Sequence, residues 1–311
     1  VEIEATMRKP VVIMGIYVAD LAFLADRMPV MGETILGNFR SGPGGKGSNQ
    51  SVAAARAGAE VSFITCIGRD SFGEAARKTW SGVDIDQSFI TESESSTGGA
   101  FIFVQNGTGN NAIIVAPGAA NDLTAQDIDK AETRLRQAAV FMTQLETPVP
   151  LALHALKLAR KHKVTTILNP APAVPVPDEI YPLVDFLTPN ETEASALSGV
   201  EVVDAESAGK AADRLLAKGI GAALITLGEK GAFYKDKQQA QLIPSFKAGP
   251  VVDTTGAGDA FNGGFACALA EGKSPLEAAR FGCATGSLSV TRVGTAPAMP
   301  TRAEIDHLLL S

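Results

Sequence analysis

The chain has 311 residues, of which 45% are hydrophobic and 20% charged, and its formal net charge is −7. A chain of this length can bury a substantial core and suits one large α/β domain. The acidic balance argues against a duplex nucleic acid partner, which would favour a basic face, and no apolar run is long enough to cross a bilayer. A small anionic ligand remains compatible with this charge, because its binding site is local.

Cysteine usage and the start of the chain bear on the cellular compartment. Cys66, Cys267 and Cys283 lie far apart and form no CxxC pattern, so we expect buried free thiols, with neither a disulfide framework nor a zinc site. The first nine residues are polar and lack the apolar core of a signal peptide, and two interpretations stay open for those ahead of Met7, native or added. These features predict a cytoplasmic protein.

The first expected strand ends close to an acidic residue. Val11 to Gly15 is aliphatic and ends in glycine, which is typical of a buried parallel strand. Ligands of open α/β sheets bind beyond the carboxyl ends of the strands, and there the carboxylate of Asp20 can accept hydrogen bonds from sugar hydroxyls. An ordinary turn aspartate is the alternative interpretation of Asp20.

A glycine-rich segment follows a second strand, expected over Thr34 to Arg40. The segment Ser41 to Gly47 (SGPGGKG) allows the backbone to approach a ligand closely, and Asn49 to Ala57 then predicts a helix of small residues. It formally matches G-x-G-x-x-G, which keeps an NAD-binding oxidoreductase as an alternative, although these glycines do not follow a buried strand. It is not a Walker A loop, because Lys46 precedes a glycine instead of serine or threonine.

Two β-rich runs within Thr97 to Ala116 flank the turn sequence NGTGN, which indicates a hairpin. Together with Thr34 to Arg40, they predict a small β-sheet set off from the main body, with strands from about residues 17–42 and 97–116. Such a sheet is a natural lid over a site, and its exposed face could also be a dimer surface.

The remaining chain alternates between helices and strands. We expect helices over residues 125–138, 150–161 and 205–218, and strands over residues 61–67, 140–144, 164–168, 186–187 and 222–226. This alternation predicts a single domain spanning residues 1–311, with an α/β fold built on a doubly wound, mostly parallel sheet flanked by helices.

Polar residues follow three of these strands. Glu146 comes after one strand, Asn190 and Glu193 open the helix after another, and Thr226 to Gly231 (TLGEKG) follows a third. Strand ends that converge on one edge of a parallel sheet favour a binding crevice. The spacing of Asn190 and Glu193 also fits a capping box, and TLGEKG fits an ordinary turn.

The stretch Val251 to Asp259 (VVDTTGAGD) predicts the end of a buried strand, a glycine turn and the start of a helix. Amides at such a helix start lack acceptors and attract an anion. The nearby carboxylate of Asp259 is a poor phosphate ligand, but it can take a proton from a hydroxyl that attacks the phosphate. The arrangement indicates phosphoryl transfer to an alcohol, and a helix-capping aspartate is the alternative.

Four ordered motifs together resemble the ribokinase branch of the PfkB carbohydrate kinase family. They are GGKGSNQ at Gly44 to Gln50, NETE at Asn190 to Glu193, TLGEKG at Thr226 to Gly231 and DTTGAGDAFNGG at Asp253 to Gly264. The resemblance covers nearly the whole chain. It implies an ATP-dependent sugar kinase that phosphorylates the primary hydroxyl of a small sugar, with D-ribose converted to D-ribose 5-phosphate as the leading expectation.

The resemblance also implies roles for individual residues. Asp259 would be the base that activates the sugar hydroxyl, while amides around Gly256, Ala257 and Gly258 would stabilise the transferring phosphoryl group. The positions that match the family's sugar contacts are Asp20, Gly45, Lys46, Gly47, Asn49, Glu146 and Asp259. Those that match its nucleotide site are Asn190, Thr226, Leu227, Gly228, Glu229, Gly231, Gly258 and Cys283.

Two kinds of metal ion are implied as well. Asn190 and Glu193 would act on Mg²⁺ through its bound waters, which this ion retains readily. An activating K⁺ would lie at positions matching Asp253, Thr255, Ser289, Arg292, Gly294 and Ala298. Ala298 stands where the family often has serine, so this site keeps its strength only if a backbone carbonyl is the ligand there.

Two further departures concern the substrates. Val18 stands where ribokinases commonly place asparagine and resembles deoxyribokinases, so 2-deoxyribose or another small sugar remains an alternative substrate. Cys283 stands where histidine often lies beside the adenine, which alters nucleotide packing more than catalysis. A non-catalytic sugar-binding protein is a remote alternative, and a homodimer through the lid strands is the expected assembly.

Overall fold

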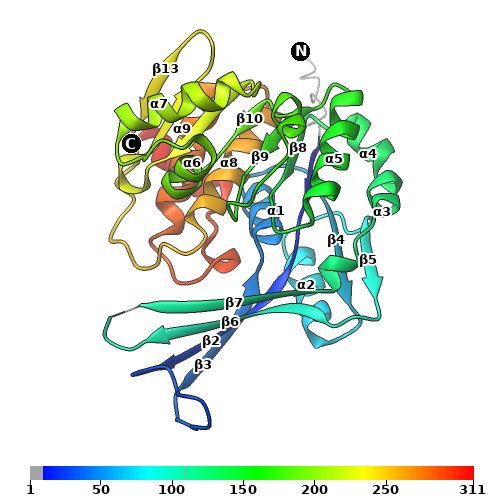
Figure 1. Ribbon diagram of the computed structural model, residues 1–311, viewed down its shortest axis with the longest axis vertical. Coiled ribbons are helices and arrows are strands. Elements are labelled where there is room, and N and C mark those ends of the chain that lie inside the picture. Colours follow the sequence, from blue (N-terminus) through cyan, green and yellow to red (C-terminus); the bar gives the residue numbers. More distant parts are fainter. Residues whose placement is uncertain (1–9, 109) are drawn as a thin grey trace.

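Two separate sheets organise the chain in the computed structural model, which describes residues 10–108 and 110–311 (Figure 1). The larger sheet has the strand order β13-β12-β11-β10-β9-β8-β1-β4-β5. Its strands are β1 (Val11–Met14), β4 (Val61–Gly68), β5 (Ile90–Ser93), β8 (Val140–Thr143), β9 (Thr165–Leu168), β10 (Phe186–Leu187), β11 (Ala222–Thr226), β12 (Ala232–Lys235) and β13 (Ala240–Ile243). The run from β11 to β5 is parallel, whereas β12 and β13 form an antiparallel edge. The residues ahead of Met7 lie outside the described part of the chain.

Helices cover both faces of this sheet, because successive strand residues point to opposite sides. Val11 and Ile13 of β1 lie in one core cluster, and Val12 and Met14 lie in the other. The first cluster includes helices α1 (Lys46–Arg56), α2 (Ser71–Ser81), α8 (Ala257–Ala270), α9 (Pro275–Ser289) and α10 (Arg302–Leu310). The second includes α3 (Ala125–Lys130), α4 (Glu132–Gln137), α5 (Val149–Lys161), α6 (Glu191–Ser198) and α7 (Ala205–Ala217). The predicted doubly wound α/β architecture is therefore confirmed.

The strand order reverses at β1, which lies between β4 and β8. In open α/β sheets a crevice forms outside the carboxyl ends of strands at such a reversal. The chain leaves β1 at Gly15 and leaves β8 at Gln144, so these two positions border the crevice.

The second sheet has the order β3-β2-β6-β7 and extends from the α/β body as a layer of its own (Figure 1). Its strands are β2 (Val18–Ala25), β3 (Asn38–Gly44), β6 (Thr97–Gln105) and β7 (Asn111–Gly118). The predicted hairpin is present as β6 and β7, which pair antiparallel, and β2 pairs parallel to β6. One face carries the exposed side chains of Phe23 and Phe39, whose rings are centred 5.1 Å apart, and the ring of the partly buried Phe101, centred 5.6 Å from that of Phe23.

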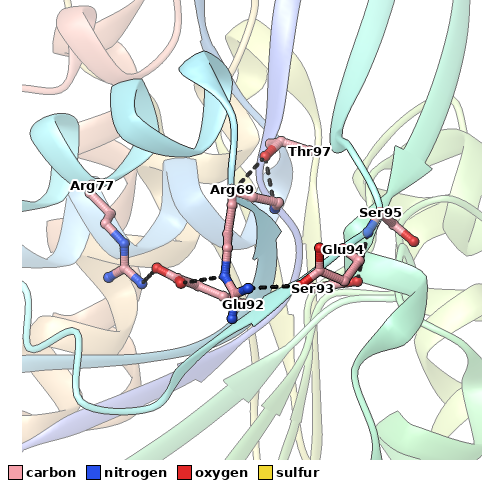
Figure 2. A network of polar contacts seen from close by, with 8 residues as sticks. Arg69, Arg77, Glu92, Ser93, Glu94, Ser95 and Thr97 are labelled. Carbon is pink, nitrogen blue, oxygen red and sulfur yellow. Dashed lines mark hydrogen bonds and ion pairs between the residues drawn. The ribbon is translucent and has the colours of Figure 1, made fainter.

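The start of β6 is tied to the start of α2. The backbone N–H of Thr97 donates to the Asp70 carboxylate at 2.7 Å, and Asp70 also accepts from the N–H of Gly73 at 2.9 Å. The Thr97 hydroxyl accepts from the N–H of Gly68 at 2.9 Å. Figure 2 shows the ion pairs that surround this joint, namely Arg69–Glu92, Arg69–Glu94 and Arg77–Glu92. The small sheet is thus attached to the body by directed hydrogen bonds at the base of β6.

Three predictions about local structure were wrong. Val251 and Val252 do not end a buried strand: they are 67% and 55% exposed in an irregular segment, and the N–H of Val252 donates to the carbonyl of Val290 instead of to a strand. The strand expected over Thr34 to Arg40 instead runs from Asn38 to Gly44, which places glycines inside it. The helix expected over residues 125–138 is interrupted at Ala131.

Candidate active site

Asp259 lies in the first turn of α8 without capping that helix. The N-cap is Gly256, whose φ of 77° places it in the left-handed region that glycine tolerates. The Asp259 carboxylate instead accepts hydrogen bonds from two side chains of α1, Asn49 Nδ2 and Gln50 Nε2, both at 3.0 Å. The capping interpretation of Asp259 is therefore wrong, and its carboxylate is held between two helices.

Burial controls the ionisation of Asp259. The side chain is 7% exposed, and desolvation raises its pKa, while Lys46 and the amides of Asn49 and Gln50 act in the opposite direction. A carboxylate with a raised pKa is a better proton acceptor at neutral pH than an exposed one.

Two more acids face the same crevice. Burial raises the pKa of Asp20 to about 6, with a further contribution from the Asp259 charge. Burial likewise raises the pKa of Glu146 to about 7, against the attraction of Lys46 and a 2.8 Å hydrogen bond from the Lys46 backbone N–H. Although burial opposes it, the surrounding carboxylates raise the pKa of Lys46, which keeps this side chain positively charged. The cluster offers several carboxylate acceptors and one cation, a set suited to a polyhydroxylated ligand.

Glycine residues, which have no side chain, leave the space in which this cluster assembles. A Cβ on Gly44 would lie 2.1 Å from Asp20 Oδ1, and a Cβ on Gly47 would lie 2.6 Å from the Cα of Gly15. Gly45 has a φ of 86° at the entry to α1. Asp20 itself lies within β2 and not in a turn, so the small sheet carries it to the crevice.

A cavity of about 380 Å³ lies beside the first turn of α8, where Ala257 and Gly258 line it. It brings together most of the residues predicted for the nucleotide, namely Thr226, Gly228, Glu229, Gly231, Gly258 and Cys283. Leu227 is 3% exposed and is not in its lining, and neither is Asn190. Its apolar walls include Phe246 and Val290, which lie outside the quoted motifs, and Phe261, which lies within DTTGAGDAFNGG but has no predicted role. The cavity and the acidic cluster therefore meet at the start of α8.

The sequence NETE forms the capping box that its spacing also allowed. Glu193 N–H donates to Asn190 Oδ1 at 2.8 Å, and Asn190 N–H donates to Glu193 Oε2 at 2.9 Å. Glu193 is 9% exposed, and burial raises its pKa. Its charge still acts on Lys46, so α6 contributes to the electrostatics of the crevice.

The positions predicted for a monovalent cation connect two loops. The Asp253 carboxylate accepts from the N–H of Thr255 at 2.9 Å and from the N–H of Gly294 at 3.0 Å. The side chain of Arg292 pairs with Glu304 of α10. Ala298 is 1% exposed. The Ser289 hydroxyl donates to Gly286 O at 2.8 Å. In the described ranges no cluster of three or more His, Cys, Asp or Glu side chains is placed to hold a metal ion.

The α/β fold, the buried carboxylate of Asp259 and the cavity beside α8 together define a candidate enzyme site. Residues 8–302 match the model of the pfkB family carbohydrate kinases, and the chain belongs to this family. It is 44% identical to the ribokinase of Haemophilus influenzae over 96% of this chain and 97% of that one, and 34% identical to the deoxyribokinase of Salmonella typhi over 96% and 98%. The structure of Arabidopsis thaliana ribokinase complexed with ribose and ATP superimposes with a TM-score of 0.91 and 31% identity, covering 97% of this chain and 99% of that one. Across the part of the chain described, no helix combines the length and apolarity that a membrane span requires.

Proposed function

We propose that this protein is an ATP-dependent sugar kinase that converts D-ribose to D-ribose 5-phosphate. The observation that carries the proposal is the position of Asp259, which is buried at the start of α8 between the acidic cluster and the neighbouring cavity. The names of the ribokinase relatives support ribose and ATP as substrates. Cys66, Cys267 and Cys283 are buried and form no disulfide with one another, which supports a reducing, cytoplasmic setting.

The chemistry follows from this geometry. Asp259 takes the proton of the attacking primary hydroxyl, whose oxygen forms the new bond to the γ-phosphorus. The bond from that phosphorus to the ADP oxygen breaks, and its electron pair leaves with ADP. The amides around Gly256, Ala257 and Gly258, at the positive end of α8, stabilise charge on the transferring group, although the Ala257 N–H also donates to Thr254 O at 3.2 Å.

The sugar lies against the acidic cluster. Asp20 and Glu146 accept hydrogen bonds from the sugar hydroxyls, and the backbone of Gly45 and Gly47 lets the sugar approach closely. Asn49 Oδ1 is buried and has no hydrogen-bond partner within the described chain, so a sugar hydroxyl that donates to it removes an unpaired polar atom. Lys46 stays charged and binds either a sugar oxygen or a phosphate.

Two cations complete the proposed site. Mg²⁺ would be held through waters by Asn190 and Glu193, whose oxygen atoms suit this ion, and it supplies neutralisation of the phosphate charge. K⁺ would be held by backbone carbonyls near Asp253, and it supplies a positive charge beside the anion-binding turn. Buried Ala298 offers a carbonyl but no hydroxyl to that site.

The proposal is tested by ADP release from Mg²⁺-ATP with K⁺ in the presence of ribose, 2-deoxyribose, fructose, adenosine or no sugar. We expect ribose to give the highest kcat/KM. Asp259→Asn should lower kcat by a factor of about 10²–10⁴ with little change in sugar affinity, because only proton removal is lost. Sugar binding without any turnover would favour the non-catalytic alternative, and wild-type turnover by Asp259→Asn would overturn the assignment of the base.

Deoxyribose is the second candidate substrate, and Val18 favours it. The Val18 side chain is 3% exposed and belongs to an apolar cluster with Ile16 and Ala100, so this position offers a sugar hydroxyl no partner. Val18→Asn should raise the ratio of kcat/KM for ribose to that for 2-deoxyribose. An unchanged ratio would remove Val18 from the determinants of specificity.

We also propose a single catalytic domain over residues 1–311, with the four-stranded sheet as a lid whose outer face forms a homodimer. Asp20 links this sheet to the site, so closure would position the sugar and exclude water. Phe39 and Ile114 are 56% and 69% exposed on the sheet, as expected for a covered surface. Ile114→Asp should yield monomers in light scattering, whereas Val203→Asp, at a site 58% exposed elsewhere on the protein, should not. A wild-type monomer at assay concentrations would refute the dimer.

A further inference from the structure

Gln50 is a fully buried amide that touches the Asp259 carboxylate. It lies on α1 with 0% of its surface exposed, and its Nε2 donates to Asp259 Oδ1 at 3.0 Å. Burying a glutamine costs free energy unless each of its polar atoms finds a partner, and an apolar residue would fill the same space without that requirement. The site keeps the amide nonetheless.

The orientation of this amide is fixed from both ends. Gln50 Nε2 donates a second hydrogen bond to Asn169 Oδ1 at 3.0 Å, and Gln50 Oε1 accepts from Gln144 Nε2 at 2.5 Å. A flipped Gln50 would place its oxygen against both the Asp259 carboxylate and Asn169 Oδ1, and its NH₂ group against the NH₂ group of Gln144. Gln144 fits in turn because position 15 is glycine, where a Cβ would lie 2.2 Å from Gln144 Oε1.

The hydrogen bonds continue from Gln50 back to the turn that carries the base. Asn169 Nδ2 donates to Thr188 O at 2.8 Å, and the Thr188 hydroxyl donates to Asn262 Oδ1 at 2.6 Å. Asn262 Nδ2 donates to Gly258 O at 2.8 Å, the residue directly before Asp259. The network therefore forms a closed ring through α1, the ends of β9 and β10, and α8. All of its side chains are at most 7% exposed.

We propose that Gln50 is the positioning residue for the base, holding the Asp259 carboxylate in one orientation and favouring its ionised form through an amide that Gln144 and Asn169 lock in place. The inference rests on the proposed function, in which Asp259 accepts the proton. Asn49 binds one carboxylate oxygen and also faces the sugar, whereas Gln50 binds the other oxygen from inside the core. Gln50 therefore acts on the reaction only through Asp259.

The consequence is a specific pH dependence. A hydrogen bond to the ionised form of a carboxylate lowers its pKa, and the Gln50 bond, like the Lys46 charge and the Asn49 amide, offsets part of the rise that burial causes at Asp259. The other acids whose pKa responds to the Asp259 charge are Asp20, Glu146 and Glu193, and both variants described below leave them in place. Loss of the Gln50 donor should move the ionisation of Asp259 to higher pH by about one unit. At a pH on the acid side, the ionised fraction of Asp259 would then be about tenfold smaller. A purely structural role would lower the thermal stability and reduce the rate by one factor at every pH.

The test uses Gln50→Met, which keeps the length of the side chain and removes both donors. We expect the acid limb of the single-turnover rate to shift upward by about one pH unit, with recovery of much of the rate at high pH and little change in sugar KM. Gln144→Met, which removes the donor that orients Gln50, should shift the limb in the same direction by less. This second variant keeps the test available if Gln50→Met fails to fold. Thr285→Val is the matched control, because Thr285 is also 0% exposed but bonds only within its own helix, to Phe281 O at 2.8 Å.

Two outcomes would separate this inference from the proposed function. If the wild type transfers phosphate and Asp259→Asn does not, an acid limb of Gln50→Met that coincides with the wild-type limb overturns the role of Gln50 alone. If no sugar is phosphorylated, the proposed function fails. The ¹³C titration of the Asp259 carboxyl still reports whether Gln50→Met raises its pKa, as we expect, or leaves it unchanged, which would refute the inference.

Discussion

Replacing Glu146 by glutamine should stabilise the protein, and only at neutral and alkaline pH. Burial raises the pKa of Glu146 from an ordinary value of 4.5 to about 7. Each pKa unit corresponds to about 1.4 kcal/mol, so ionised Glu146 lowers the free energy of unfolding by at most about 3.5 kcal/mol. Glutamine avoids this cost, and its oxygen can still accept the hydrogen bond from the Lys46 N–H.

The pH window follows from the direction of the shift. Below pH 4.5 the carboxyl group is protonated in both the folded and the unfolded chain, so the charge costs nothing. Between 4.5 and 7 the unfolded chain loses this proton while the folded protein keeps it, and the free energy of unfolding falls as the pH rises. Above pH 7 the full cost is present.

Urea unfolding of the ligand-free protein at pH 5 and pH 8 measures the effect. We expect Glu146→Gln to raise the free energy of unfolding by up to about 3.5 kcal/mol at pH 8 and by less than about 1 kcal/mol at pH 5. Glu206→Gln, which removes a carboxylate that is 79% exposed in its pair with Lys210, should change little at either pH. An equal gain at both pH values, or a loss at pH 8, would show that burial of the charge is not what destabilises this site.

Two further predictions use glycines with matched controls. Gly44→Ala places a Cβ 2.1 Å from Asp20 Oδ1, whereas Gly42→Ala on the same strand meets nothing within 4 Å. Gly44→Ala should therefore raise the sugar KM by at least about tenfold and Gly42→Ala should not, and equal KM values in steady-state assays would refute the role of Asp20. Gly263→Ala places a Cβ 2.5 Å from a side chain of α1 and should lower the free energy of unfolding by about 2 kcal/mol. Gly209→Ala, on α7, places a Cβ in ordinary contact with the ring of Phe233 and should raise the free energy of unfolding by up to about 1 kcal/mol. Thermal melts that place both variants on the same side of the wild type would contradict this account.

The sequence predicts the elements whose signal is local. The aliphatic run at Val11 and the NGTGN turn before Asn111 each predict their own structure, because burial and turn chemistry act on neighbouring residues. Strands β12 and β13 were missed because they are short and partly exposed, and their pairing with β11 is a tertiary property. The pair Val251 and Val252 predicts a strand because valine has high β-propensity, but a strand also needs a partner strand, which local sequence does not specify.

The candidate site divides in the same way. Asp259 and the glycines around it lie in one contiguous motif, so the sequence alone predicts that they belong to one site. Gln50 lies within the motif GGKGSNQ, but its ring of partners is spread over positions 144, 169, 188 and 262, which share no spacing. The fold of the sheet brings these side chains into contact, and no one of these positions reveals the network in the sequence.

The outer strand of the small sheet has a consequence for handling the protein. Strand β7 pairs with β6 on one side only, and its residues Ile113, Ile114 and Val115 are 54%, 69% and 47% exposed. An uncovered edge strand rich in β-branched residues is a template for strand addition and fibril growth. The proline at position 117 lacks an N–H and limits such growth at one end of the strand only. Whatever covers this sheet in solution therefore also governs how long a concentrated sample resists aggregation.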